Sequence, residues 1–360
     1  MRLNHFNLLP YLLGRSWLDA TTVVAGDAVV IERRLRHTSF VVEQRSGDGV
    51  FVKQLHDPHP NAAASLRREA AFYRAVATGR LAQLAGFVPT FVGYDEHEHI
   101  LALALVDGVS AQDRAVSGRP LNAVEAAALG TALAATHAVA AATARAAAPG
   151  ALDETVPWAF HLAQFLAGSS QPLPGAGASF IGVLRSHPQL IDWLGQVAAW
   201  WRHGTLIHGD LKWENVLLPN ASSAAEASNP GNQGRVRLID WELAAVGDPA
   251  WDLATLVQAP LVRSALVLGQ ARALDRSDLT PHREALRALV GAWVTATRPH
   301  DPGQEYQRLL SYTAVRLVYS AYEHAAVSPQ IHPAILAMVA TAWQMLRDRH
   351  FADALLGFAS

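Results

Sequence analysis

Short runs in which hydrophobic and polar residues alternate occupy the first third of the chain, and longer runs with a helical period follow them. Such alternation predicts strands that bury one face, and the Ser-Gly-Asp-Gly sequence at residues 46–49 is typical of a hairpin turn. The strands predicted in this way span residues 29–35, 39–43, 50–55, 88–94 and 99–106. Together they predict a small antiparallel sheet.

One helix is predicted within this sheet region, at residues 60–78. Pro60 and Asn61 open it, with Asn61 as the expected cap, and Gly79 follows its last turn. The apolar residues of this helix recur with the spacing of one helical face: Leu66, Phe72, Tyr73 and Val76. We therefore expect this face to pack on the sheet.

The rest of the chain is predicted to be mainly helical. A short amphipathic helix is expected at residues 8–18, and Asn122 is expected to cap an alanine-rich helix at 121–147. Further helices are predicted from Pro249, with Asp248 as its cap, and at residues 284–297, 305–325 and 333–356. Ser-, Pro- and Gly-rich stretches at 168–179 and 220–234 are predicted to be a surface loop and a hairpin insertion.

This order of elements predicts an α+β chain of two lobes. The expected small lobe of antiparallel strands spans residues 1–106, and the expected large, mainly helical lobe spans 107–360, with Asp107 and Gly108 as the hinge. We see no internal repeat.

Composition narrows the class of function. Of the 360 residues 17% are charged and the formal net charge is −2, so no basic surface field points to nucleic acid. The chain has no cysteine, which excludes thiol catalysis. The first residues do not have the pattern of a signal peptide, and no apolar run has the length of a membrane span. We expect a soluble, cytoplasmic protein without a membrane partner.

A polar motif lies between two apolar runs, residues 205–207 and 216–218, which we predict to be strands. The motif is His-Gly-Asp-Leu-Lys-Trp-Glu-Asn at residues 208–215. Asp210 can accept a proton from a hydroxyl group, Lys212 can face a phosphate, and the amide oxygen of Asn215 can bind Mg²⁺. This spacing suits phosphoryl transfer better than a plain turn.

A second motif follows the apolar run 236–239. Asp240, Trp241 and Glu242 place two carboxylates directly after a predicted strand. Since Mg²⁺ prefers oxygen ligands, Asn215, Asp240 and Glu242 form the expected metal set. The alternative is that these are solvated loop acids, which the pairing of the two motifs disfavours.

The two motifs resemble those of the aminoglycoside phosphotransferase and choline kinase family, relatives of the eukaryotic protein kinases. This resemblance implies a bilobal protein kinase-like fold, ATP and Mg²⁺ as cofactors, and a catalytic loop at residues 208–215. Gly209 stands where protein kinases have the arginine that contacts a phosphorylated activation loop. Its absence implies an enzyme that is active without that switch.

The resemblance also implies the nucleotide contacts. Lys53 on a strand and Glu69 on the following helix match the ion pair that holds nucleotide phosphates in kinase-like folds, the alternative for Lys53 being an exposed edge charge. No glycine lies between residues 28 and 45, so the hydroxyls of Thr38 and Ser39 are the candidate phosphate contacts, unless this is only a hairpin tip. Adenine would lie against the backbone around Leu105.

The expected catalytic residues are Asp210, Lys212 and His208. Of these, His208 is expected to pack and orient the loop rather than to transfer protons. Asp252 is expected to support the loop by hydrogen bonding, as the resemblance implies. We expect His137 to be a packing histidine and Arg68 to be a solvated charge.

The phosphate acceptor is the least determined part of the prediction. Arginines about balance the acids in the C-terminal helices, which disfavours a polycationic aminoglycoside. Four segments are similar to the kinase component of class V lanthipeptide pathways: residues 33–42, 51–54, 68–73 and 208–215. That similarity implies Ser/Thr of a precursor peptide as the acceptor and a companion lyase or cyclase as partner. The alternatives are a small-molecule alcohol kinase and, less favoured, a nucleotide-binding pseudokinase.

Overall fold

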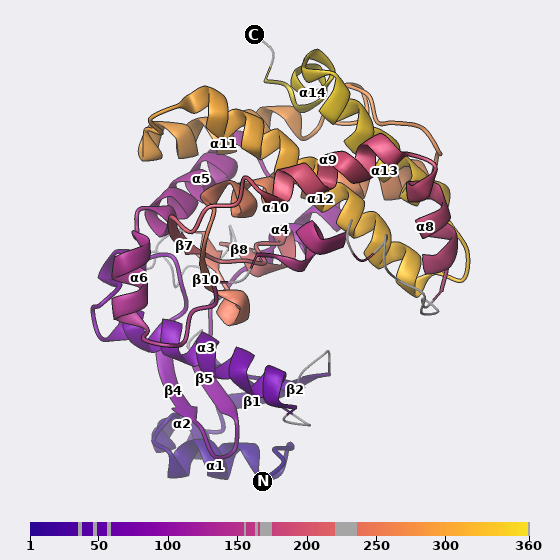
Figure 1. Cartoon of the computed structure of the whole chain (residues 1–360). Coiled ribbons are helices and arrows are strands. Elements are labelled where there is room, and N and C mark those ends of the chain that lie inside the picture. Colours follow the sequence, from indigo (N-terminus) through magenta and orange to yellow (C-terminus); the bar gives the residue numbers. More distant parts are fainter. Residues whose placement is uncertain are drawn as a thin grey trace. The chain divides into compact units, whose positions relative to one another are not determined.

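The computed structural model describes residues 1–34, 38–45, 49–55, 59–154, 156–162, 165, 175–219 and 236–358, with the side chains of 33 and 34 left out (Figure 1). The chain forms two compact units. The first comprises Met1–Arg114, Ala142–Asp153 and Glu214–Ala244, and the second comprises Ala115–Ala141, Glu154–Trp213 and Ala245–Ser360. The lobe boundary expected after residue 106 stays a prediction.

The first unit is built on an antiparallel sheet in the order β1-β2-β3-β5-β4. Its strands are β1 (Ala28–Arg34), β2 (Thr38–Gln44), β3 (Gly49–Gln54), β4 (Phe91–Asp95) and β5 (Ile100–Ala104). The five expected strands are therefore present; burial alternates only in part, since Ile100 to Leu103 of β5 are all buried. Of the turns expected between the first three strands, residues 36 and 37 and residues 46–48 lie outside the described residues, and Thr38 and Gly49 begin β2 and β3. The predicted insertion at 220–234 also lies outside them, as do residues 168–174 of the predicted surface loop.

Helix α3 (Pro60–Ala77) lies beside this sheet (Figure 1) and buries the expected apolar stripe. The expected cap at Asn61 was wrong. His59 is the residue before the helix and makes no capping hydrogen bond with its side chain, and Pro60 takes the first position of the helix. Proline fits there because that position needs no amide donor, so Asn61 falls inside the first turn.

The N-terminal segment, residues 1–24, packs against the face of the sheet opposite to α3. It contains α1 (Leu8–Gly14), which was expected, and α2 (Ala20–Val24), which was not. Its buried leucines pack with strand residues in one core cluster: Leu3, Leu8, Leu12, Leu18, Phe40, Val42, Val50, Val52, Ile100 and Ala102. The side chain of Gln54 points to this segment, whereas that of its neighbour Lys53 points to α3, as alternation along β3 requires.

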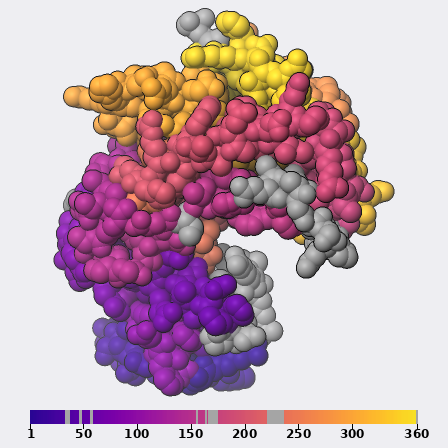
Figure 2. Space-filling model, viewed as in Figure 1, coloured from indigo at the N-terminus to yellow at the C-terminus, as the bar shows by residue number. Residues whose placement is uncertain are grey.

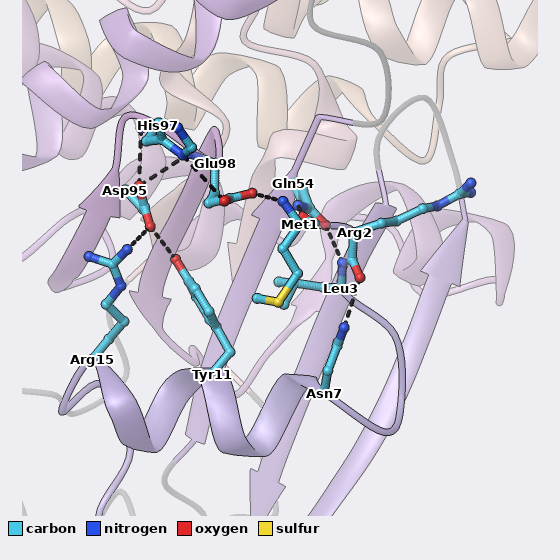
Figure 3. A network of polar contacts seen from close by, with 10 residues as sticks. All are labelled: Met1, Arg2, Leu3, Asn7, Tyr11, Arg15, Gln54, Asp95, His97 and Glu98. Carbon is cyan, nitrogen blue, oxygen red and sulfur yellow. Dashed lines mark hydrogen bonds and ion pairs between the residues drawn. The ribbon is translucent and has the colours of Figure 1, made fainter.

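Polar contacts fix the N-terminal segment in place (Figure 3). The buried Gln54 side chain accepts from the amide of Leu3 at 2.9 Å and donates to the carbonyl of Met1 at 2.8 Å. The Tyr11 hydroxyl donates to Asp95 at 2.8 Å, and Arg15 forms an ion pair with the same carboxylate (Figure 3). Strand β3 is thus held on one face by the N-terminal segment, through Gln54, and on the other face by α3, through Lys53.

A second, three-stranded sheet completes the first unit, with strand order β6-β8-β9. Its strands are β6 (Val109–Ser110), β8 (Val216–Leu218) and β9 (Arg237–Leu238), followed by the 3₁₀ turn η5 (Trp241–Leu243). The amide of Leu238 donates to the carbonyl of Phe87 at 2.7 Å, and Arg237 donates to the carbonyl of Gly86 at 2.7 Å. These bonds attach β9, and with it the second motif, to the segment that precedes β4.

The second unit is mainly helical. Its helices are α5 (Ala123–His137), α8 (Gly177–Arg185), α9 (Pro188–Ala198), α10 (Pro249–Leu268), α11 (Arg283–Thr297), α12 (Pro302–Val327), α13 (Pro333–Arg347) and α14 (Arg349–Leu356). Strands β7 (Thr205–Ile207) and β10 (Ala245–Gly247) pair antiparallel. None of the helices in the described part of the chain has the length and apolar character of a membrane span.

Two predicted helices are broken in the structure. The alanine-rich helix ends at His137, and a second helix, α6 (Ala141–Ala147), begins after Ala140 pairs with Thr205. The C-terminal helix is interrupted at Asp348, whose side chain caps α14 by accepting from the amide of Phe351. Asn122 and Asp248 cap α5 and α10 as expected. Helices α8 and α9 were not predicted; they pack against α12 and form part of the surface of the second unit (Figure 2).

Candidate active site

The second motif forms a tight turn in the first unit. Asp240 follows β9 with φ 65° and ψ 57°, a left-handed conformation that aspartate tolerates better than most residues. Trp241 is fully buried and donates through its indole nitrogen to the carbonyl of Leu238 at 3.0 Å. Its ring stacks on Phe72 of α3 with a centroid distance of 3.9 Å and an interplanar angle of 12°. The tryptophan therefore anchors the turn between the two acidic residues.

Four charged side chains meet beside this turn. The ammonium nitrogen of Lys53 lies 3.0 Å from the Glu69 carboxylate, 2.7 Å from Asp240 and 3.1 Å from Glu242. Lys53 is only 5% exposed and Glu69 only 2%. This burial excludes the alternative that Lys53 is a solvated charge at the sheet edge.

The balance of charge in this cluster is negative. Burial alone would lower the pKa of Lys53, but the carboxylates of Glu69, Asp240 and Glu242 outweigh it and raise that pKa above its usual range. Burial raises the pKa of Glu69, aided by the nearby Asp240 and Glu242 carboxylates and opposed by Lys53. Three acids around one ammonium thus leave an excess of negative charge that a further cation would stabilise.

The donor set fits a hard divalent cation. Ligand oxygens of Glu69, Asp240 and Glu242 all lie within 4.8 Å of one another. Asn215 belongs to the same unit, and its main-chain carbonyl accepts from the amide of Ile239 at 3.0 Å, next to Asp240 in the chain. The predicted metal set thus comes from adjacent strand ends, and Glu69, which sequence reasoning gave to the nucleotide, adds a further carboxylate.

The other predicted nucleotide contacts lie on the first sheet. Thr38 and Ser39 belong to β2 rather than to the turn before it; Thr38 is buried and pairs with Gln54, and Ser39 pairs with Lys53. The amide of Leu105 donates to the carbonyl of Gly49 at 2.9 Å, directly after β5. Their roles toward a nucleotide stay predictions.

The loop of the first motif is held by one carboxylate in the second unit. Asp252, in the first turn of α10, is fully buried and accepts from the amides of His208 at 2.7 Å and Gly209 at 3.0 Å. Gly209 has φ 83°, which glycine adopts without strain, and its carbonyl accepts from the indole of Trp251 at 3.0 Å. The expected supporting role of Asp252 is confirmed.

A buried histidine in turn orients Asp252. The Nε2 atom of His137 lies 3.2 Å from the Asp252 carboxylate, and the indole of Trp293 donates to His137 Nδ1 at 2.9 Å. Because an indole nitrogen only donates, Nδ1 is the acceptor and the His137 proton sits on Nε2, toward Asp252. Sequence reasoning predicted a packing histidine but not this contact, because 115 residues separate the two partners.

The candidate base and its lysine lie together in the second unit. The ammonium group of Lys212 is 2.9 Å from the carboxylate of Asp210. Burial would lower the pKa of Lys212, but Asp210 outweighs it by charge and hydrogen bonding and raises that pKa. His208 is fully buried, and its Nδ1 lies 3.4 Å from the amide of Asp210, which fits a residue that orients the loop.

The expectation that Arg68 is a solvated charge was wrong. Its guanidinium donates to the carbonyls of Ala151 and Glu242, both at 3.0 Å, and lies 3.3 Å from the carboxylate of Asp153. The side chain is only 16% exposed. Its position on the helix face next to Glu69 gave no sequence signal, because these partners come from distant parts of the chain.

Three features define the class of this protein: a small antiparallel sheet with a buried Lys-Glu pair, an acidic turn, and a His-Gly-Asp loop. They are those of a protein kinase-like phosphotransferase, an enzyme that transfers phosphate to a hydroxyl acceptor. Residues 30–289 match the phosphotransferase enzyme family, and the chain belongs to that family. No curated protein matches the sequence.

Solved structures support the fold. The macrolide 2'-phosphotransferase MphH from Brachybacterium faecium, an apoenzyme, aligns with 18% identity and a TM-score of 0.51 over 93% of this chain and 97% of that chain. The GDP and kanamycin complex of APH(2")-IIia aligns with 14% identity and a TM-score of 0.53, over the same shares of the two chains, 93% and 97%. The comparisons leave the similarity to lanthipeptide kinases unconfirmed.

Proposed function

We propose that this protein uses Mg²⁺ and ATP to transfer the γ-phosphate to a hydroxyl group of a small molecule. The observation that carries the proposal is the buried contact of Lys53 with Glu69, Asp240 and Glu242 in a member of the phosphotransferase enzyme family. An ammonium group held among acids at the ends of two strands suits the binding of phosphates together with a divalent cation.

Each residue of the cluster has a distinct part in binding. Lys53 contacts the α- and β-phosphates, and Glu69 keeps its ammonium group in place. The oxygens of Asn215, Asp240 and Glu242 hold Mg²⁺, whose chemistry when bound is to neutralise phosphate charge. Thr38 and Ser39 on β2 add hydroxyl contacts, and adenine lies against the backbone at Leu105.

Chemistry on the acceptor falls to the loop of the second unit. Asp210 would orient the acceptor hydroxyl and take its proton as the hydroxyl oxygen bonds to the γ-phosphorus and the bond from that phosphorus to the bridging oxygen of ADP breaks, so that ADP leaves. Lys212, which is paired with Asp210 at 2.9 Å, would supply positive charge for the transferred phosphate, and His208 and Asp252 keep the loop in shape.

An aromatic group in the second unit supports an acceptor with an apolar face. Trp158 is 43% exposed, and its ring lies 5.6 Å from those of Tyr319 and Tyr322. Burial and the neighbouring Glu323 raise the pKa of Tyr319 to about 12, and Asp210 is among the charges that act on it. The exposed ring of Trp158, beside the half-buried rings of Tyr319 and Tyr322, offers a stacking surface in the same unit as Asp210 and so favours an acceptor with an apolar face.

Ser/Thr of a precursor peptide is the second candidate acceptor. Lys212 favours it, because protein kinases that act on Ser/Thr carry a lysine at this position of the loop. A peptide would spread its contacts over many residues of the second unit, whereas a small alcohol needs a few convergent groups.

Labelled ATP distinguishes these acceptors. With Mg²⁺ and γ-labelled ATP, we expect phosphate on an alcohol with a large apolar face such as a macrolide, with at least about tenfold lower kcat/KM for the polycation kanamycin, the scale of one lost favourable contact. Labelling of Ser/Thr peptides alone would replace the small molecule by the second candidate. Preference for kanamycin would contradict both, and absence of any transfer would contradict the proposed function.

A further inference from the structure

One face of α3 packs against the acidic turn. Ser65, Arg68, Glu69 and Phe72 follow one another at the spacing of a helical face. Phe72 stacks on Trp241, and Glu69 reaches Asp240 and Glu242 through Lys53. Ser65 and Arg68 instead form hydrogen bonds with the main chain of the turn.

Both side chains bind the main-chain carbonyl of Glu242. It accepts from the Ser65 hydroxyl at 3.1 Å and from the Arg68 guanidinium at 3.0 Å. The other two nitrogens of Arg68 bind the carbonyl of Ala151 at 3.0 Å and the carboxylate of Asp153 at 3.3 Å. The planar fork of arginine can hold these acceptors together, and a lysine cannot.

The turn needs such support for two reasons. Asp240 holds a left-handed backbone conformation that costs energy for a residue with a side chain. In addition, ligand oxygens of Glu69, Asp240 and Glu242 lie within 4.8 Å of one another and repel. Left to itself, the turn would relax so that the carboxylates separate.

We propose that Arg68 is a positioning residue for the divalent cation: with Ser65, it fixes the Glu242 carbonyl and so keeps the carboxylates of Asp240 and Glu242 converged. The inference rests on the proposed function. It assigns to Arg68 an effect on metal affinity, although its own charge is positive.

The two possible roles of Arg68 predict opposite changes in Mg²⁺ affinity when its charge is removed. Removing a positive charge beside a cation site should by itself strengthen Mg²⁺ binding. If Arg68 positions the turn, Arg68→Met should instead weaken it, by the 10- to 100-fold typical of residues that orient metal ligands. Arg67 is the matched control: it lies next to Arg68 on α3 and is exposed, and within the described residues its ion-pair partner is Glu96, at 3.9 Å.

The experiment measures the Mg²⁺ concentration that half-saturates ATP binding, by calorimetry at fixed ATP, with the folded fraction of each variant checked by circular dichroism. We expect an increase of about 10- to 100-fold for Arg68→Met, a smaller increase for Ser65→Ala, a partial one for Arg68→Lys, and no change for Arg67→Met. An unchanged or lower value for folded Arg68→Met would overturn the inference. Failure of the wild-type protein to bind Mg·ATP would instead overturn the proposed function.

Discussion

Asp210→Asn should lower the turnover of phosphate transfer by about 10²- to 10⁴-fold, the usual contribution of a positioned acid or base. Asparagine has the same shape but cannot take the hydroxyl proton. Its loss of the ion pair with Lys212 should change stability by at most about 1 kcal/mol, since that lysine is 44% exposed. The affinity for Mg·ATP should stay near that of the wild type, because the Lys53 cluster is untouched.

Steady-state transfer of phosphate measures this effect, with whichever of the acceptors tested with labelled ATP reacts best. Lys212→Met removes the same ion pair but keeps the carboxylate of Asp210, and it also removes the charge proposed to face the phosphate. We expect it to lose less turnover than Asp210→Asn, because the proton acceptor is still present. Near-normal transfer by Asp210→Asn would remove this residue from the mechanism.

Lys53→Met should have the second large effect, on both stability and nucleotide binding. It leaves Glu69, which is 2% exposed, facing Asp240 and Glu242 without its cation. Breaking a buried ion pair on one side typically costs about 3–5 kcal/mol, and the loss of the phosphate contact should abolish tight Mg·ATP binding. Urea unfolding and calorimetric ATP titration measure the two losses separately.

The pH dependence of this loss has a definite sign. Burial already raises the pKa of Glu69, and removal of Lys53 takes away the charge that opposes this shift. The folded state then holds a proton that the unfolded state has released, so its stability falls as the pH rises through the raised pKa. Because the pKa of Glu69 is already raised to about 7 in the wild type and lies higher in the variant, we expect the deficit of Lys53→Met relative to wild type to shrink as the pH is lowered from alkaline values to about 7, and to level off below that.

A second substitution separates the two roles of Lys53. Lys53→Met combined with Glu69→Gln removes the unpaired buried charge and should recover part of the lost stability, without recovering ATP affinity. Recovery of both would show that Lys53 acts only by pairing with Glu69. A stability equal to wild type in Lys53→Met alone would contradict the burial of this cluster.

The strands of the first sheet and both motifs were predictable because their signals are local. Alternation or an apolar run over a few residues identifies β1 to β5 and β7 to β9, whereas the short strands β6 and β10 were not predicted. Residues 208–215 and 240–242 carry their chemistry within one loop each. Lys53 and Glu69 could be paired because the strand and the helix that carry them follow one another in the chain, only 16 residues apart.

Contacts between distant segments were not predictable. Arg68 meets Glu242 across 174 residues and Asp153 across 85, so a polar position on a helix was assigned to solvent. The break after α5 falls in an alanine-rich run with high helix propensity, where pairing of Ala140 with Thr205 overrides the local preference. In the first turn of α3 the local rule for Pro60 competed with that for Asn61, and the proline rule applied.

Titration of ATP into the wild-type protein and Asp240→Ala, each with saturating Mg²⁺ and with a chelator, tests the central claim most directly. If Lys53, Glu69, Asp240 and Glu242 form one site for nucleotide and metal, the wild type should bind ATP tightly only with Mg²⁺. Asp240→Ala should bind clearly more weakly and lose most of the response to Mg²⁺, because it lacks the carboxylate 2.7 Å from Lys53. Wild-type affinity in the variant, or ATP binding that is indifferent to Mg²⁺ in the wild type, would contradict this assignment.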